Sequence, residues 1–186
     1  MNTKKEIDMI WTPPVRLRFM DLDNTIKYTD PQTKEEKDTG KYGVRVFYAQ
    51  QRDSEFQGMR NALQQRIIDV FKTIPSDIDQ DWTSVLGPEN QRYPNTVWFK
   101  ATTKYKDRLV LVNQADRSIL DSSAFYPGCW VRLLVTPAAY PGQWNKKFAR
   151  FNLSGMAFYA DDEPFVASIS TEEALAMLNE SNQVPF

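Results

Sequence analysis

Hydrophobic and polar residues alternate along much of this chain with the two-residue period of a half-exposed β-strand. The first such run extends from Val15 to Phe19, where Arg16 and Arg18 separate the apolar positions. A second run, rich in residues that favour strands, covers Tyr42 to Ala49. Four more strands are predicted near residues 96–105, 108–113, 129–136 and 147–159.

One segment has the period of a helix instead. Between residues 55 and 73, apolar side chains recur every three or four positions and form a single stripe. Ser54 and Gln57 make a capping-box pattern at its start, and Pro75 follows its end. A second, short helix is predicted near residues 171–179.

Two polar stretches, residues 21–40 and 75–95, are predicted to be long loops because they are rich in turn-forming residues. The predicted strands outnumber the helices. They also alternate in polarity, unlike the continuous apolar strands of a buried parallel sheet. The pattern therefore predicts a mostly β, antiparallel domain with one packed helix.

The composition excludes several kinds of catalytic and metal site. The 186 residues include no His, so a Ser-His-Asp triad, a Cys-His pair and a His-ligated metal are impossible. Cys129 is the single cysteine, which excludes an intrachain disulfide and a Cys-rich zinc site. It shares a strand face with Val131 and Leu133, so we expect it to be buried. No cofactor is predicted.

No apolar run is long enough to span a membrane, and the polar N-terminus lacks the apolar segment of a signal peptide. A single cysteine is typical of a reducing compartment. Together these features predict a cytoplasmic protein with no membrane partner.

The formal net charge is only −1, but the charges are unevenly distributed. Residues 1–150 hold all 23 basic residues and 18 of the acidic ones, a net charge of +5. Residues 151–186 hold six acidic residues and no basic one, a net charge of −6. The chain therefore combines a basic body with an acidic C-terminal end.

The segment Asp21-Leu22-Asp23-Asn24-Thr25 is a first candidate for chemistry. It resembles the nucleophile motif of haloacid-dehalogenase-type phosphatases, in which two Asp carboxylates and Mg²⁺ cooperate in phosphoryl transfer. That motif follows a buried parallel strand, which is uniformly apolar. Here the preceding strand carries Arg16 and Arg18. A surface loop in which Asp and Asn support turns is the alternative.

Basic and aromatic residues are interleaved between residues 92 and 150. A single-stranded nucleic acid exposes phosphates and unstacked bases, so its binders place Lys or Arg beside flat rings. Trp130 with Arg132, and Phe148 with Arg150, each share a strand face. The predicted nucleic-acid-binding residues are Lys100, Lys104, Tyr105, Lys106, Arg108, Trp130, Arg132, Tyr140, Trp144, Lys146, Lys147 and Arg150.

The alternative for each of these residues is structural. Aromatic residues on strands are usually core, and Lys and Arg are usually solvated surface. Trp144 is the most suggestive single ring, because it lies in a polar hairpin loop where a core role is least expected.

The acidic C-terminal end finishes in Val184-Pro185-Phe186. Phe186 offers a ring beside a free carboxylate, which suits a basic, apolar pocket on a partner protein. The acidic segment could also fold back on the basic face and compete with nucleic acid. A frayed tail with an incidental Phe is the third interpretation.

The segment Asp121-Ser122-Ser123-Ala124-Phe125-Tyr126-Pro127-Gly128-Cys129 resembles the D-x-S-x-F-Y-x-G-C block of a tailed-phage single-stranded DNA-binding protein family. The resemblance extends over roughly residues 12–165 and is densest over 119–165. It includes Gly40-Lys41-Tyr42-Gly43-Val44, Tyr140, Asn145-Lys146, Phe151-Asn152-Leu153 and Asp162-Glu163-Pro164.

The resemblance implies an OB-like β-barrel with long loop insertions over residues 1–165, followed by an acidic tail over 166–186. It also implies a non-enzymatic protein of phage replication and recombination, which coats single-stranded DNA in the host cytoplasm. The tail is similar to tails that dock replication proteins, although Asn182 and Gln183 stand where acidic residues are usual. The alternatives are a Mg²⁺-dependent phosphatase that uses Asp21 and Asp23, or a phage structural or interaction module.

Overall fold

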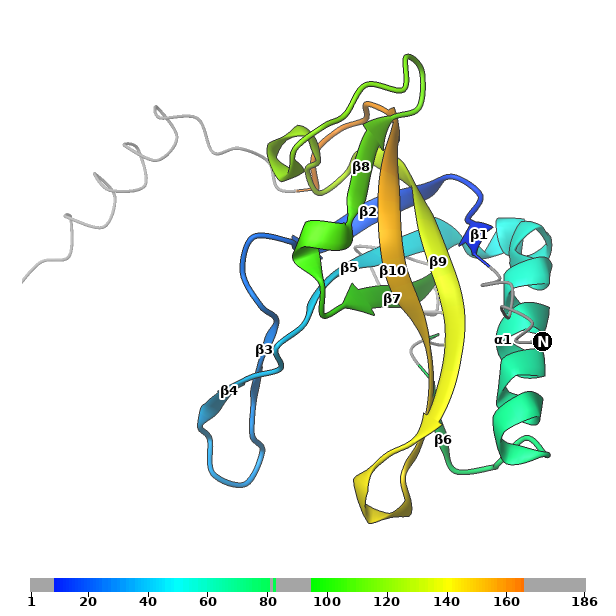
Figure 1. Ribbon diagram of the computed structural model, residues 1–186. Coiled ribbons are helices and arrows are strands. Elements are labelled where there is room, and N and C mark those ends of the chain that lie inside the picture. Colours follow the sequence, from blue (N-terminus) through cyan, green and yellow to red (C-terminus); the bar gives the residue numbers. More distant parts are fainter. Residues whose placement is uncertain (1–8, 81, 83–94, 166–186) are drawn as a thin grey trace, which may run out of the picture.

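Five strands close into a barrel (Figure 1). The computed structural model describes residues 9–80, 82 and 95–165. Around the barrel the order is β9, β2, β5, β7, β10 and back to β9. The barrel strands are β2 (Val15–Asp21), β5 (Tyr42–Ala49), β7 (Thr96–Thr103), β9 (Trp130–Pro141) and β10 (Lys147–Ala160).

Shorter strands extend this sheet. The strand β1 (Ile10–Trp11) pairs with β9, and β6 (Ile78–Gln80) and β8 (Val110–Asn113) both pair with β10. The strands β3 (Lys27–Thr29) and β4 (Glu36–Asp38) form a separate hairpin that extends from the barrel (Figure 1).

The prediction of an antiparallel barrel is wrong, because the barrel is mixed. Four of its neighbouring pairs are antiparallel, but β7 and β10 run parallel, with Phe151 opposite Ala101. The number of strands is the reason. In a closed ring of five strands, neighbours cannot all run in opposite directions, so at least one neighbouring pair must be parallel. The predicted strand positions and the mostly β class with one main helix are confirmed.

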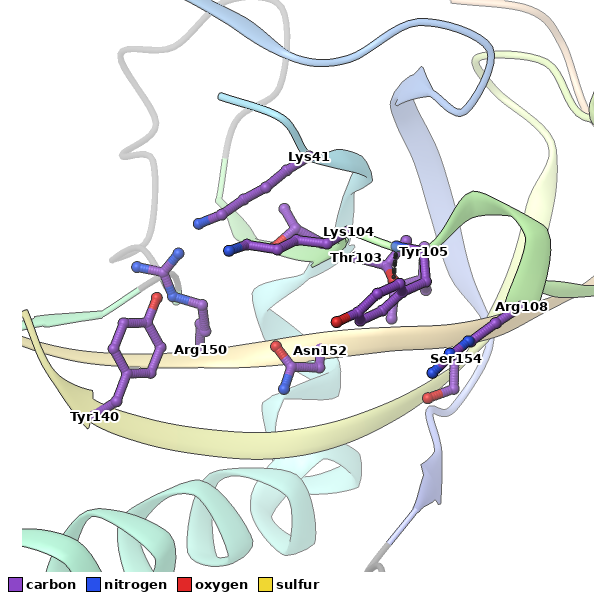
Figure 2. Close-up of a pocket in the computed structure, with 11 residues that line it drawn as sticks. Lys41, Thr103, Lys104, Tyr105, Arg108, Tyr140, Arg150, Asn152 and Ser154 are labelled. Carbon is purple, nitrogen blue, oxygen red and sulfur yellow. Dashed lines mark hydrogen bonds between the residues drawn. The ribbon is translucent and has the colours of Figure 1, made fainter. Parts of the chain in front are cut away.

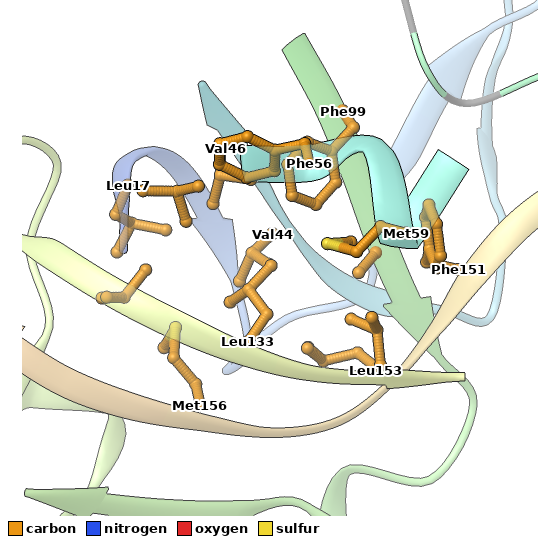
Figure 3. Close-up of a cluster of buried hydrophobic side chains, with 14 of the residues drawn as sticks. Leu17, Val44, Val46, Phe56, Met59, Phe99, Leu133, Phe151, Leu153 and Met156 are labelled. Atoms are coloured by element: carbon orange, nitrogen blue, oxygen red, sulfur yellow. The ribbon is translucent and has the colours of Figure 1, made fainter. Parts of the chain in front are cut away.

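The barrel interior is filled by the inward-facing residues of the alternating strands. Leu17, Val46, Phe99, Leu133 and Phe151 are each almost completely buried (Figure 3). Their alternation with outward-facing polar residues is the period that predicted the strands. Cys129 is fully buried, as predicted, and burial raises the pKa of its thiol.

The helix α1 (Gln57–Phe71) packs beside β9 and buries Met59, Leu63 and Ile67. A 3₁₀ turn over residues 50–56 precedes it, so the expected capping pair of Ser54 and Gln57 is not formed. The N-cap is Phe56, whose ring stacks on Tyr48 in the core. No described helix is long and apolar enough to cross a membrane.

The predicted loop at residues 21–40 contains the β3–β4 hairpin. Its turn is held by the Asp30 carboxylate, which accepts hydrogen bonds from the backbone of Gln32 and Thr33 and from Lys37 Nζ at 2.6 Å. Lys27 and Glu36 form an ion pair across the strands at 3.1 Å. Most of the other predicted loop, and the predicted helix at 171–179, lie outside the described residues.

Replacing Leu133 with Ala should destabilise the barrel strongly. The side chain is fully buried, and a Leu→Ala change in a core costs about 2–5 kcal/mol. Ile119→Ala is the matched control, because Ile119 is 88% exposed and should change the free energy of unfolding by at most ~0.5 kcal/mol. Urea denaturation measures both values, and equal losses would contradict this core assignment.

Acid should loosen the β3–β4 hairpin. The hydrogen bonds from Lys37, Gln32 and Thr33 lower the pKa of Asp30 from 3.8 to about 2. Because the folded pKa is the lower one, the contribution of this carboxylate is complete above about pH 4 and is lost as the pH falls towards 2. The amide NMR shifts of Gln32 and Thr33 should titrate with a midpoint near 2. A midpoint near 4, or an unchanged titration in Asp30→Asn, would contradict the assignment.

Candidate nucleic-acid interface

A groove of about 570 Å³ opens where β7 and β10 separate. The two strands are paired only at Ala101–Phe151 and Thr102–Asn152, and beyond these pairs the chain leaves β7. Cationic and aromatic side chains from both sides line the groove. They are Lys41, Lys104, Tyr105, Arg108, Tyr140 and Arg150 (Figure 2).

The alternation of β10 directs its polar residues into the groove. Arg150, Asn152 and Ser154 line it, while Ala149 and Phe151 are buried in the barrel. This arrangement confirms the assignment of faces that the sequence period predicted for this strand.

Arg150 is part of a cluster with two rings at one end of the groove. Its guanidinium carbon is 4.9 Å from the centroid of the Tyr140 ring and 5.1 Å from that of Phe148. The two rings are cross-strand neighbours, 5.6 Å apart. A side chain at Gly142 would place its Cβ 2.2 Å from the Phe148 ring, so glycine permits this packing.

The tyrosine at the other end of the groove is more exposed. Tyr105 is 54% exposed, and the Arg108 guanidinium carbon lies 4.5 Å from the centroid of its ring. The Tyr105 backbone N–H donates to Thr103 Oγ1, which fixes the chain as it leaves β7. The ring is therefore held at the surface beside a cation.

The charge of the groove is positive. Lys41, Lys104, Arg108 and Arg150 contribute four cations, and none of the described residues that line the groove is acidic. Figure 2 shows the ends of Lys41, Lys104 and Arg150 on one side of the groove, near the Tyr140 ring. Cations beside exposed rings can hold phosphates and stack bases at the same time.

The turn between β9 and β10 presents a further ring. Trp144 is 90% exposed and has a φ of 59°, a backbone conformation that is uncommon for bulky residues. The Gly142 backbone N–H donates to the Lys146 carbonyl and closes the turn. Lys146 is exposed, and Lys147 forms an ion pair with Asp77 at 2.9 Å.

Trp130 and Arg132 do not line this groove, although the sequence predicted them beside the others. The Trp130 indole N–H donates to Asp162 at 2.7 Å, and Arg132 Nε donates to the Thr12 carbonyl at 2.8 Å. Both side chains are thus engaged in contacts that hold the ends of the described chain against the barrel. Their role in binding stays a prediction.

Lys100 and Lys106 also lie outside the groove lining. Lys100 is opposite Arg45 in the pairing of β5 with β7, on the outer face of the barrel. Lys106 is 3.1 Å from the Asp23 carboxylate, which also accepts a hydrogen bond from Ser122. These bonds from Ser122 and Lys106 lower the pKa of Asp23. Phe186 falls outside the described residues.

The Asp21–Asp23 segment does not have the setting of a phosphatase nucleophile. It begins at the last residue of β2, and this strand is antiparallel to both β5 and β9, whereas that motif requires a buried parallel strand. Asp23 is bound by Ser122 and Lys106. The phosphatase alternative is therefore not supported.

Lys41, Asn152 and Ser154 are groove residues that were not among the predicted binding residues. Lys41 precedes β5 in a segment without a clear period. The signal for Asn152 and Ser154 was present, because they alternate with Arg150 along one strand face.

The groove lies between the two connections that bind oligonucleotides in OB-type barrels. In such barrels these are the loop between the first and second strands and the loop between the fourth and fifth. Here they are the β2–β5 connection, which contains the β3–β4 hairpin, and the β9–β10 turn. Lys41, at the end of the first connection, and Tyr140, close to the start of the second, both line the groove.

Comparisons with known proteins agree with this architecture. A family model described as the ssDNA-binding protein of Enterobacter phage Enc34 matches residues 9–184. No curated protein matches the chain by sequence.

Several solved structures share the fold. The single-stranded DNA-binding protein from bacteriophage Enc34 in complex with ssDNA has a TM-score of 0.65 and 18% identity, over 85% of this chain and 89% of that one. A second structure of the single-stranded DNA-binding protein from bacteriophage Enc34 has a TM-score of 0.63 and 19% identity, over 90% of this chain and 89% of that one. The gp2.5 single-stranded DNA-binding protein of bacteriophage T7 has a TM-score of 0.54 and 10% identity, over 88% of this chain and 97% of that one.

These likenesses confirm the OB-like barrel that the sequence resemblance implied. The family model covers nearly the whole chain, including the groove and both of its flanking connections. The chain belongs to the family of the ssDNA-binding protein of Enterobacter phage Enc34.

Proposed function

We propose that this protein coats single-stranded DNA with little sequence preference, without enzymatic activity, during phage DNA replication or recombination. The observation that carries the proposal is the groove, which combines four cations with two tyrosine rings and has no acidic residue among its described lining. Family membership, and the ssDNA bound to the Enc34 protein, support it.

The groove chemistry supports binding without sequence readout. The four groove cations, Lys41, Lys104, Arg108 and Arg150, would contact phosphates, which are the same for every base. Tyr105 and Tyr140 would stack on bases, and every base has a face that can stack. Trp144 and Lys146 would continue the interface along the β9–β10 turn.

Binding to oligo-dT should depend steeply on salt. Each phosphate contact to a single strand lowers the slope of log affinity against log salt by about 0.7, so the four groove cations predict a slope of about −3. Tryptophan fluorescence titrations at several salt concentrations measure it. Absence of binding at low salt would contradict the proposed function, and salt-independent binding would contradict the groove assignment.

Removing the Tyr105 ring should weaken binding. One base–ring stack is worth ~1–3 kcal/mol, so Tyr105→Ala should raise the dissociation constant for oligo-dT by about 5- to 150-fold. Tyr159→Ala is the matched control, since Tyr159 is similarly exposed, at 48%, and does not line the groove. Equal effects of the two substitutions in fluorescence anisotropy titrations would show that Tyr105 does not stack on DNA.

A further inference from the structure

The turn between β9 and β10 displays Trp144 without using it to hold the fold. The side chain is 90% exposed, and its indole has no hydrogen-bond, ring or cation partner among the described residues. Its backbone has a φ of 59° and a ψ of 36°, in the left-handed region that bulky residues rarely adopt. Asn145 has the same φ but is a residue type that tolerates this region. A strained residue that contributes no packing points to a role outside the fold.

The turn that carries this ring is firmly built. The two strands stay paired up to Pro141 and Lys147, and the Gly142 backbone N–H donates to the Lys146 carbonyl at 2.7 Å beyond that pair. The Phe148 ring packs against Gly142, and β6 pairs with the start of β10 from the other side. The indole is therefore presented to solvent from a braced hairpin.

The turn follows one end of the groove. Tyr140 and Arg150 line that end, and Pro141 is the last residue of β9 before the turn. Trp144 comes three residues later, and Lys146, two residues after it, is an exposed cation. A DNA strand that runs along the groove and leaves it past Tyr140 therefore reaches an exposed ring beside a cation.

The groove itself selects single strands. Its tyrosine rings stack only on uncovered base faces, whereas inside a duplex each base is paired and covered by its neighbours. The terminal pair of a duplex is the exception, because it leaves one flat, apolar face open to water. Tyr105 and Tyr140 lie within the groove lining, each with a guanidinium beside its ring. Trp144 lies beyond the lining, where a duplex that is too wide for the groove would begin.

We propose that Trp144 stacks on the terminal base pair where a duplex joins the single strand held in the groove. The interface then binds a junction of single- and double-stranded DNA more tightly than a single strand alone. Lys146 contacts the backbone of the second strand beside that pair. The inference rests on the proposed function, since the groove must hold the single strand. Its consequence is that coating extends to the last unpaired base of a single-stranded region.

Three labelled probes test the proposal with the full chain in fluorescence anisotropy titrations. They are oligo-dT alone, and the same oligo-dT joined at its 5′ end or at its 3′ end to a duplex stem. Both junctions are needed, because the direction of the strand in the groove decides which of its ends reaches the turn. The wild type should bind one junction at least about 5-fold more tightly than oligo-dT, the gain of one stack. Trp144→Asn should abolish that preference.

Asparagine is chosen because it tolerates the left-handed backbone at this position. The thermal unfolding midpoint of Trp144→Asn should therefore equal or exceed that of the wild type, and a clear fall would show that the ring is structural and would overturn the proposal. Trp144→Phe keeps a smaller ring and should retain part of the preference. Ile119→Ala is the matched control, since Ile119 is 88% exposed outside the groove lining, and it should retain all of it.

The failure of this inference differs from the failure of the proposed function. If the wild type binds oligo-dT but binds all three probes equally, or if Trp144→Asn keeps the junction preference, the role of Trp144 is overturned and the coating function stands. If the wild type does not bind oligo-dT at all, the proposed function itself fails.

Discussion

The closure of five strands into one barrel is the constraint on which the rest of this structure depends. An odd ring must contain at least one parallel pair, and here the chain places it between β7 and β10. That pair meets over only two residue pairs, whereas β9 and β10 stay paired along almost their full length. Where β7 turns away from β10, the groove opens. The candidate interface is thus a product of how the barrel closes, and its lining comes from segments far apart in the sequence.

The alternation of polarity predicted where the strands lie, because each barrel strand has one buried and one outward side. It could not predict which strands are neighbours or in which direction they run, since a strand in a mixed barrel alternates like one in an antiparallel sheet. The β3–β4 hairpin was missed for a different reason. Its strands have no buried face, and it is held by the Asp30 turn and by the Lys27–Glu36 ion pair, neither of which produces a period in the sequence.

The sequence pattern was also unable to predict which cations line the groove. Arg150 and Arg132 show the same pattern in the sequence, a cation two residues from an aromatic residue on a strand. The structure separates them, because Arg150 lines the groove whereas Arg132 donates to the Thr12 carbonyl beside β1. Only the packing of a distant segment distinguishes the two, and a local pattern contains no information about it.

The near-zero net charge is compatible with binding a polyanion because of where the carboxylates lie. Two of the cations predicted to bind DNA are paired with acidic residues: Lys106 with Asp23, and Lys147 with Asp77. Their carboxylate side chains are 63% and 61% exposed, and ion pairs at such surfaces contribute only ~0–1 kcal/mol. A phosphate can therefore replace each carboxylate at little cost in stability. In the function that we propose, each such pair marks a cation that an incoming strand would engage by replacing the carboxylate, and the near-zero total charge does not reveal these cations.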